Sequence, residues 1–173
     1  MKNIEIKYRL SQLQKMTEFL SSLPEARHIK TIQQTDVYYN TFRGRLKLRI
    51  PSSGTAELIY YEREDLSSAR ESDYHLFPVK DPDLLDRLLS QALEVKVQVK
   101  KKRTLFLFRN VRIHLDQVED LGEFLEFESV LDEDTSAELA AENLNQIQKN
   151  LAHFNLIPLS GSYADLMMEN RSP

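Results

Sequence analysis

The chain has 173 residues, a size that suits one domain spanning residues 1–173. Hydrophobic residues make up 41% and charged residues 29%, which argues against disordered, fibrous and membrane-embedded proteins. The net charge of −4 argues against a nucleic-acid coat, because proteins that bind the phosphate backbone are normally basic. The chain has no cysteine and no apolar run long enough for a membrane-spanning helix. We therefore expect a cytoplasmic protein without disulfides, thiolate zinc sites or membrane segments.

The first half of the chain is dominated by strand patterns. Alternation and β-forming side chains predict strands at 3–10, 33–40, 45–50, 57–63 and 73–79. Ser11 and Gln14 stand at the spacing of a capping box, which predicts a helix over 11–23. Gly44 supplies a turn, and the polar stretch 66–72 is expected to be a loop.

The second half begins and ends with helical patterns. Asp81 followed by Pro82 predicts a helix start, and the apolar spacing continues to about Ala92. Strands are expected at 95–108, 111–118 and 124–131. Thr135 and Glu138 form a second capping-box pattern, from which helical spacing extends toward Pro158. The segment 163–168 is expected to pack against the fold or close it.

Most of these strands carry charge on one face and apolar side chains on the other, because alternate residues of a strand point to opposite faces. The apolar faces hold Ile4, Ile6, Leu46, Leu48, Leu58, Tyr60, Val111, Ile113, Leu115, Leu125 and Phe127. The ionic faces hold Glu5, Lys7, Arg9, Arg45, Lys47, Arg49, Tyr61, Arg63, Lys101, Arg103, Arg112, His114, Asp116, Glu126 and Glu128.

Two architectures explain this pattern. An antiparallel sheet commonly has one solvated face, and the charges would then point to water. Eight strands can also close into a barrel whose interior admits side chains or a small ligand. If the ionic faces point inward, the barrel becomes a charged tunnel.

A charged tunnel has a chemical use. Clustered arginine and lysine repel one another in a low-dielectric cavity unless a multiply charged anion lies among them. A triphosphate is such an anion. Carboxylates in the same cavity require a divalent cation to bridge them to phosphate, and Glu5, Asp116, Glu126 and Glu128 are the candidate metal ligands.

With these features the sequence resembles the CYTH or triphosphate tunnel metalloenzyme family. The family includes class IV adenylyl cyclases, thiamine and inorganic triphosphatases and fungal RNA triphosphatases. Its Glu-x-Glu-x-Lys signature is similar to N-I-E-I-K at 3–7. Further similarity to the cyclase-like bacterial branch lies in QTDVYYN, GRLKLRI, LIYYERED, VKKKR, RIHLDQVEDLGEFLEFE and SYADL.

The resemblance implies an α+β fold, a closed eight-stranded antiparallel tunnel with helices outside, and a triphosphate held beside Mg²⁺ or Mn²⁺. By position, Glu5, Glu126 and Glu128 would bind metal, with Asp116 a ligand or a holder of its water. The implied phosphate contacts are Lys7, Arg9, Lys47, Arg49, Arg63, Lys101, Arg103 and Arg112. Of these, Lys7, Arg63 and Arg103 are the candidate catalytic residues. Arg45 and His114 are assigned no definite role.

Asn3 departs from the signature, since an amide offers metal only a neutral oxygen in place of a carboxylate. His114 has no partner at metal-ligand spacing, so an orienting or lining role is favoured over a catalytic base. Neither a glycine-rich phosphate loop nor a nucleophile elbow occurs in the sequence.

Three functions follow. An adenylyl cyclase that converts ATP to cyclic AMP and pyrophosphate is expected, and triphosphate hydrolysis is the alternative. The third is a non-catalytic triphosphate sensor, for which Asn3 is the main support. Besides the small-molecule triphosphate we expect no nucleic-acid or membrane partner, and a homodimer is the generic expectation for a small protein.

Overall fold

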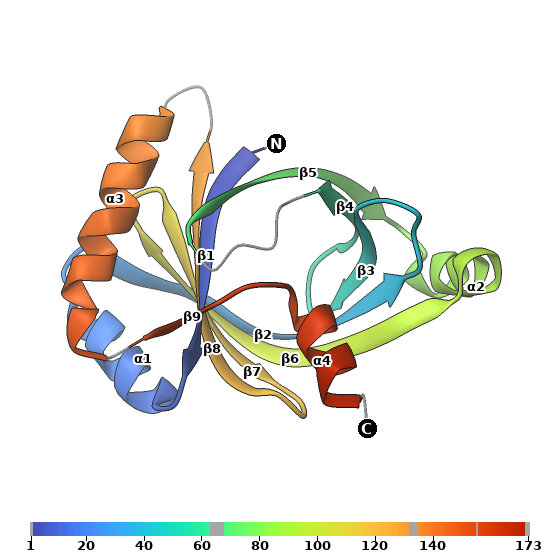
Figure 1. Cartoon of the computed structure of the whole chain (residues 1–173), viewed down its shortest axis with the longest axis horizontal. Helices are drawn as coiled ribbons and strands as arrows, with labels where there is room; N and C mark the ends of the chain where they lie inside the picture. The colour runs from blue at the N-terminus through green and yellow to red at the C-terminus, as the bar shows by residue number, and fades with distance from the viewer. Residues whose placement is uncertain (1, 63–67, 132–134, 155, 172–173) are drawn as a thin grey trace.

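The computed structural model describes residues 2–62, 68–131, 135–154 and 156–171. Its centre is a closed antiparallel barrel of eight strands, to which one short strand is added (Figure 1). The strands are β1 (Lys2–Leu10), β2 (Ala26–Tyr39), β3 (Arg45–Pro51), β4 (Ala56–Glu62), β5 (Arg70–Val79), β6 (Val95–Phe108), β7 (Val111–Val118), β8 (Gly122–Leu131) and β9 (Ile157–Leu159). The helices are α1 (Leu13–Ser22), α2 (Pro82–Leu93), α3 (Ala137–Asn150) and α4 (Tyr163–Arg171), and a short 3₁₀ turn covers Ala152–Phe154. The predicted fold class is thus confirmed.

The barrel is closed by β1, which pairs along its whole length with β8. On its other edge the first residues, Lys2 to Glu5, pair with β5. The later residues, Lys7 to Arg9, pair with β9 instead. One strand therefore joins the two ends of the sheet and also receives the C-terminal segment that leads into α4 (Figure 1).

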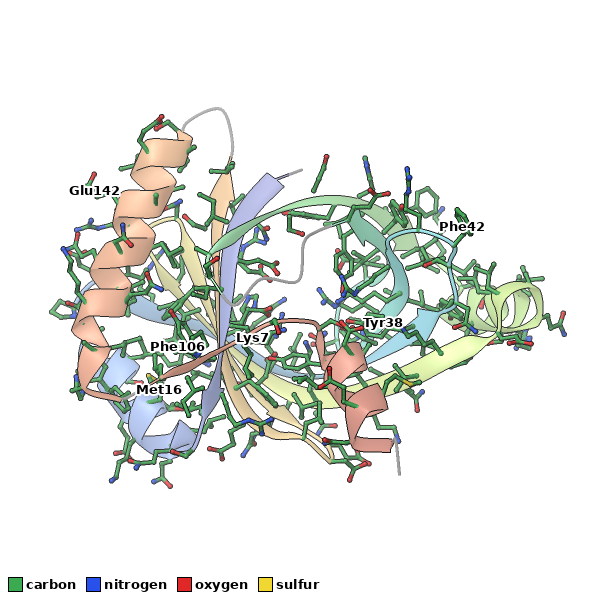
Figure 2. All side chains as sticks on the ribbon, viewed as in Figure 1. Lys7, Met16, Tyr38, Phe42, Phe106 and Glu142 are labelled. Atoms are coloured by element: carbon green, nitrogen blue, oxygen red, sulfur yellow. The ribbon has the colours of Figure 1, made fainter. Side chains whose placement is uncertain are left out.

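Apolar side chains on the outside of the barrel are covered by helices. Met16 and Phe106 are fully buried between the wall and the helices α1 and α3, whereas Glu142 lies on the outer face of α3 (Figure 2). A second cluster lies under α2 and is centred on Leu48 and Tyr39. Because the outer faces are buried by helices, the alternate faces with their charges point into the barrel.

Two helix starts differ from the sequence prediction. The helix α1 begins after Gln12, whose side chain makes no cap, and the backbone N–H of Leu13 donates to the carboxylate of Glu123 instead. A side chain from β8 thus replaces the predicted capping box. In α3 the cap is Ser136, which accepts from the N–H of Leu139. The predicted cap at Thr135 is therefore wrong by one residue. The Asp81 cap of α2 is confirmed.

Several element boundaries also differ. The strand β2 starts at Ala26, because residues before Gln33 pair with the second half of β6 although most of them are exposed. Because this first half of β2 has no alternation of buried and exposed residues, the sequence did not predict it. The predicted loop 66–72 overlaps β5, which begins at Arg70. The last long helix ends at Asn150 rather than near Pro158, and β9 was not predicted. The helix α4 agrees with the packing element expected at 163–168.

Candidate triphosphate and metal site

The barrel encloses a cavity of about 300 Å³, at the lower end of the volumes typical for small-molecule sites. Charged side chains from six strands line it. The cations are Lys7, Lys47, Arg49, Lys101, Arg103 and Arg112, and the carboxylates are Glu5, Glu57, Glu126 and Glu128. Asn3, Ser162 and several tyrosines complete the wall. The predicted inward orientation of the ionic faces thus gathers most of the predicted site residues around one space.

Strand register brings the carboxylates of β8 between two cationic strands. Glu126 lies opposite Lys7 of β1 on one side and His114 of β7 on the other. The Lys7 ammonium is 3.1 Å from Glu126, and the guanidinium of Arg103 donates to the same carboxylate at 2.9 Å. Arg103 also forms a two-point contact with Asp116, at 2.7 and 2.6 Å. These bidentate and charge-assisted bonds fix the Arg103 guanidinium.

Asp116 is fully buried behind this array. It accepts a hydrogen bond from the Tyr163 hydroxyl at 2.9 Å and lies 3.4 Å from the Lys101 ammonium. Tyr163 opens α4, and the Lys7 ammonium lies 3.8 Å from the centre of its ring. Unlike Glu126, Asp116 does not line the cavity, so its geometry suits the support of Arg103 better than direct contact with a metal.

A second ionic cluster is built around Asp36 of β2, which the sequence analysis did not single out. Its carboxylate is 3.0 Å from both the Lys47 ammonium and the Nε of Arg49. Gln34 donates to it at 3.1 Å, and Lys101 lies 4.0 Å away. Asp36 is 1% exposed. The sequence feature that could have identified Asp36 is alternation. Gln34, Asp36 and Tyr38 are alternate residues of the predicted strand 33–40 and therefore share one face of it.

Burial and neighbouring charges shift the pKa values of these groups in opposite directions. Burial raises the pKa of Asp36, but Arg49, Lys47 and Lys101 outweigh it and hold the pKa well below the usual value. Glu126 behaves likewise, because Lys7, His114 and Arg103 overcome the effect of burial on its pKa. Burial lowers the pKa of Lys47 to about 8, with Asp36 opposing and Arg49 adding to the shift. Burial and Arg103 lower the pKa of Lys101 to about 7. These lysines are therefore poised to gain charge when an anion approaches.

The donor set fits a divalent cation. Glu5 and Glu128 lie directly opposite each other on β1 and β8, an arrangement of like charges that a bridging cation would stabilise. The side-chain oxygen of Asn3 is buried and, within the described part of the chain, has no hydrogen-bond partner. His114, Glu126 and Glu128 place one possible ligand atom each within 4.8 Å of one another. We infer that Glu5, Glu126 and Glu128, with the Asn3 oxygen, would hold the metal.

Some predicted residues lie elsewhere. Arg9 is exposed and donates to the carbonyl of Leu121 outside the cavity. Arg45 pairs with Asp165 of α4 at 2.9 Å and tethers that helix. Arg112 lines the cavity but is largely exposed, with its guanidinium 4.0 Å from Glu128. Arg63, predicted as a phosphate-binding and catalytic residue, lies outside the described residues.

The sequence model of the CYTH domain family matches residues 1–156. The chain belongs to the CYTH domain family. Members of this family are metal-dependent and act as adenylyl cyclases or triphosphatases. A search of curated protein sequences found no significant match. The CYTH assignment agrees with the resemblance seen in the sequence.

Solved structures share the CYTH fold. A protein from Pyrococcus horikoshii OT3 has a TM-score of 0.77 at 24% identity, covering 95% of this chain and 98% of that one. A Vibrio parahaemolyticus protein named as a candidate adenylate cyclase has a TM-score of 0.74 at 22% identity, covering 96% and 97%. The RNA triphosphatase of Schizosaccharomyces pombe has a TM-score of 0.51 at 14% identity, covering 93% and 86%. At these identities the similarity shows the fold alone.

No helix in the described ranges is long and apolar enough to cross a membrane.

Proposed function

We propose that the chain is a metal-dependent enzyme acting on an organic triphosphate, and that its reaction is the conversion of ATP to cyclic AMP and pyrophosphate. The observation that supports it is the composition of the cavity wall. Deep charged groups lie beside a rim of apolar and aromatic side chains. The CYTH assignment supports a triphosphate as the class of substrate.

The balance of charge explains why a metal is required. Among the described residues, six cationic side chains and four carboxylates line the cavity, and the buried carboxylates of Asp36 and Asp116 lie directly behind them. A polyphosphate would therefore meet as many carboxylates as cationic side chains. A bound divalent cation supplies the missing positive charge and neutralises phosphate oxygens. Binding should therefore depend on metal.

The rim supports an organic substrate over inorganic tripolyphosphate. Ile59, Tyr74 and Leu76 line the cavity from β4 and β5. Leu76 is 38% exposed, whereas Lys7 and Lys101 are 3% and 6% exposed. Leu76 and the half-buried Tyr74 thus lie nearer the entrance than Lys7 and Lys101, whereas Ile59 is 5% exposed and lies as deep as these cations. A base and sugar at the rim would bury apolar surface while the phosphates reach the cations.

In the proposed reaction the ribose 3′-hydroxyl oxygen bonds to the α-phosphorus and its proton passes to water. The bond between the α-phosphorus and the oxygen that joins it to the β-phosphate breaks, and pyrophosphate leaves. Lys47, Arg49 and Arg103 would hold the phosphates and stabilise the pyrophosphate that leaves. Asp36 and Asp116 would fix these cations in place. Most of the catalysis would come from positioning and charge stabilisation, for which no strong protein base is needed.

Hydrolysis is the second candidate function. If the base and sugar lie at Leu76 and Tyr74, the phosphate that reaches the deepest cations is the terminal one. An arrangement that surrounds the γ-phosphate suits its transfer to water. Purified protein incubated with ATP or with tripolyphosphate, each with Mg²⁺ or Mn²⁺, distinguishes the two by chromatography of the products. Cyclic AMP with pyrophosphate is expected. Orthophosphate without cyclic AMP would instead establish hydrolysis, and binding without turnover would indicate a sensor.

The lowered pKa of Lys47 predicts a pH dependence of triphosphate binding. Below about pH 8 the free protein already carries the Lys47 charge. Above it, binding must be accompanied by uptake of a proton at Lys47, which lowers the affinity by up to about tenfold per pH unit in addition to the uptake at Lys101. Ionisation of the polyphosphate itself is the same for wild type and variant, so the difference between their slopes isolates Lys47. Calorimetric titrations with tripolyphosphate between pH 8 and 9.5 should show this loss in the wild type. In Lys47→Arg the slope should be smaller by about one proton, and an equal slope would contradict the assignment.

A further inference from the structure

His114 is a buried side chain to which the proposed reaction gives no role. It is 5% exposed and projects from β7 toward the carboxylates of β8. Its Nδ1 lies 3.6 Å from Glu126 Oε2 and 3.6 Å from Glu128 Oε1. Both separations exceed a normal hydrogen bond, and within the described residues Nδ1 has no hydrogen-bond partner. An unsatisfied buried nitrogen is costly unless a ligand uses it.

The spacing of these atoms is compatible with one shared ion. First-row metals lie about 2.0–2.2 Å from nitrogen and carboxylate ligands, so two ligands of one ion lie up to about 4.2 Å apart. The two 3.6 Å separations fall within this limit. His114 and Glu128 also line a second cavity of about 500 Å³, which shares Arg49, Arg103 and Arg112 with the first. The cluster therefore lies beside open space, by which an ion could enter.

We propose that His114 is a nitrogen ligand of the metal and that it gives the site a preference for Mn²⁺ or another first-row transition ion over Mg²⁺. This rests on the proposed metal-dependent function but adds a ligand to it. Imidazole suits first-row transition metals, whereas Mg²⁺ takes oxygen ligands almost exclusively. His114 has no partner at metal-ligand spacing in the sequence because Glu126 and Glu128 lie across the β7–β8 ladder.

The test is pulsed electron paramagnetic resonance of Mn²⁺ bound to the purified protein, with and without tripolyphosphate. A ¹⁴N modulation is expected, and growth with ¹⁵N-histidine should convert it to a ¹⁵N modulation. His114→Gln should abolish the coupling and weaken Mn²⁺ binding about tenfold, with Mg²⁺ binding changed less than about threefold. His75→Gln, on an exposed strand position, is the matched control and should change neither.

If His114→Gln does not fold, a variant that retains only His114, with His28, His75 and His153 replaced by Gln, should keep the coupling. Bound Mn²⁺ without histidine coupling in the wild type would overturn the inference and leave the proposed function intact. Coupling that survives in folded His114→Gln would also overturn it. Failure of the wild type to bind Mn²⁺ in any condition would overturn both the inference and the metal-dependent function.

Discussion

Replacement of Glu126 by Gln is expected to lower metal-dependent turnover by about 10²- to 10³-fold, the loss typical when one group that stabilises transition-state charge is removed. Glu126 contacts Lys7 and Arg103 and lies beside His114. The amide keeps the shape of the side chain but removes one negative charge and, with it, a proposed metal ligand. Steady-state kinetics with ATP at several Mg²⁺ and Mn²⁺ concentrations measures the effect.

Binding of tripolyphosphate without metal should change in the opposite direction. Removal of the Glu126 charge leaves Lys7 and Arg103 less neutralised, so metal-free affinity should rise while turnover falls. Glu142→Gln, on the outer face of α3, is the matched control and should leave both unchanged (Figure 2). Normal turnover in Glu126→Gln would contradict the metal assignment. A parallel loss of both quantities would point to a damaged fold instead.

Replacement of Asp36 by Asn should have the largest effect on stability. Lys47, Arg49 and Lys101 would lose their shared buried counter-charge. Breaking a buried ionic cluster of this kind costs about 3 kcal/mol in the free energy of unfolding. For a chain of this size that lowers Tm by about 6–12 °C. Thermal unfolding followed by circular dichroism measures the shift, and added tripolyphosphate should restore more stability in the variant than in the wild type.

The same cluster sets a pH dependence of stability. Because the pKa of Asp36 is lowered in the folded protein, its contribution is complete above the unfolded value of 3.8 and is lost as pH falls toward the folded value. The difference in Tm between wild type and Asp36→Asn should therefore persist down to about pH 4 and shrink below it. Asp83→Asn, an exposed position on α2, is the control. An Asp36→Asn protein as stable as this control would contradict the role of Asp36.

Most of the strands were predictable from the sequence because they have a charged and an apolar face. Alternation in NIEIKYRL or RLKLRI fixes both the strand and the direction of each side chain. The alternation of charged and apolar residues does not show whether the charged face points to water or into a cavity. That choice depends on closure of the sheet, which the family signature implied and the pairing of β1 with β5 provides.

The errors have local causes. Gln34 and Asp36 lie on a strand whose polar face was not sorted by alternation, so the carboxylate that organises Lys47 and Arg49 was missed. The first half of β2 is exposed and carries no burial pattern. The start of α1 depends on Glu123, which is distant in the sequence. Arg9 lies on the same face of β1 as Glu5 and Lys7, as alternation predicts. It is near the end of the barrel, however, where Leu121 and Phe124 occupy the adjacent space.

We propose that the interior of the barrel binds a triphosphate. The most direct test is calorimetric titration of tripolyphosphate into the wild type, Arg49→Met and Arg87→Met. Arg49 donates to Asp36 and lines the cavity, whereas Arg87 is exposed on α2. We predict one site in the wild type, strengthened by Mg²⁺ and weakened at least about tenfold in Arg49→Met, the value of one charge-assisted hydrogen bond. The Arg87→Met protein should bind as the wild type does. Equal affinity in the two variants, or no binding by the wild type with Mg²⁺, would contradict the account.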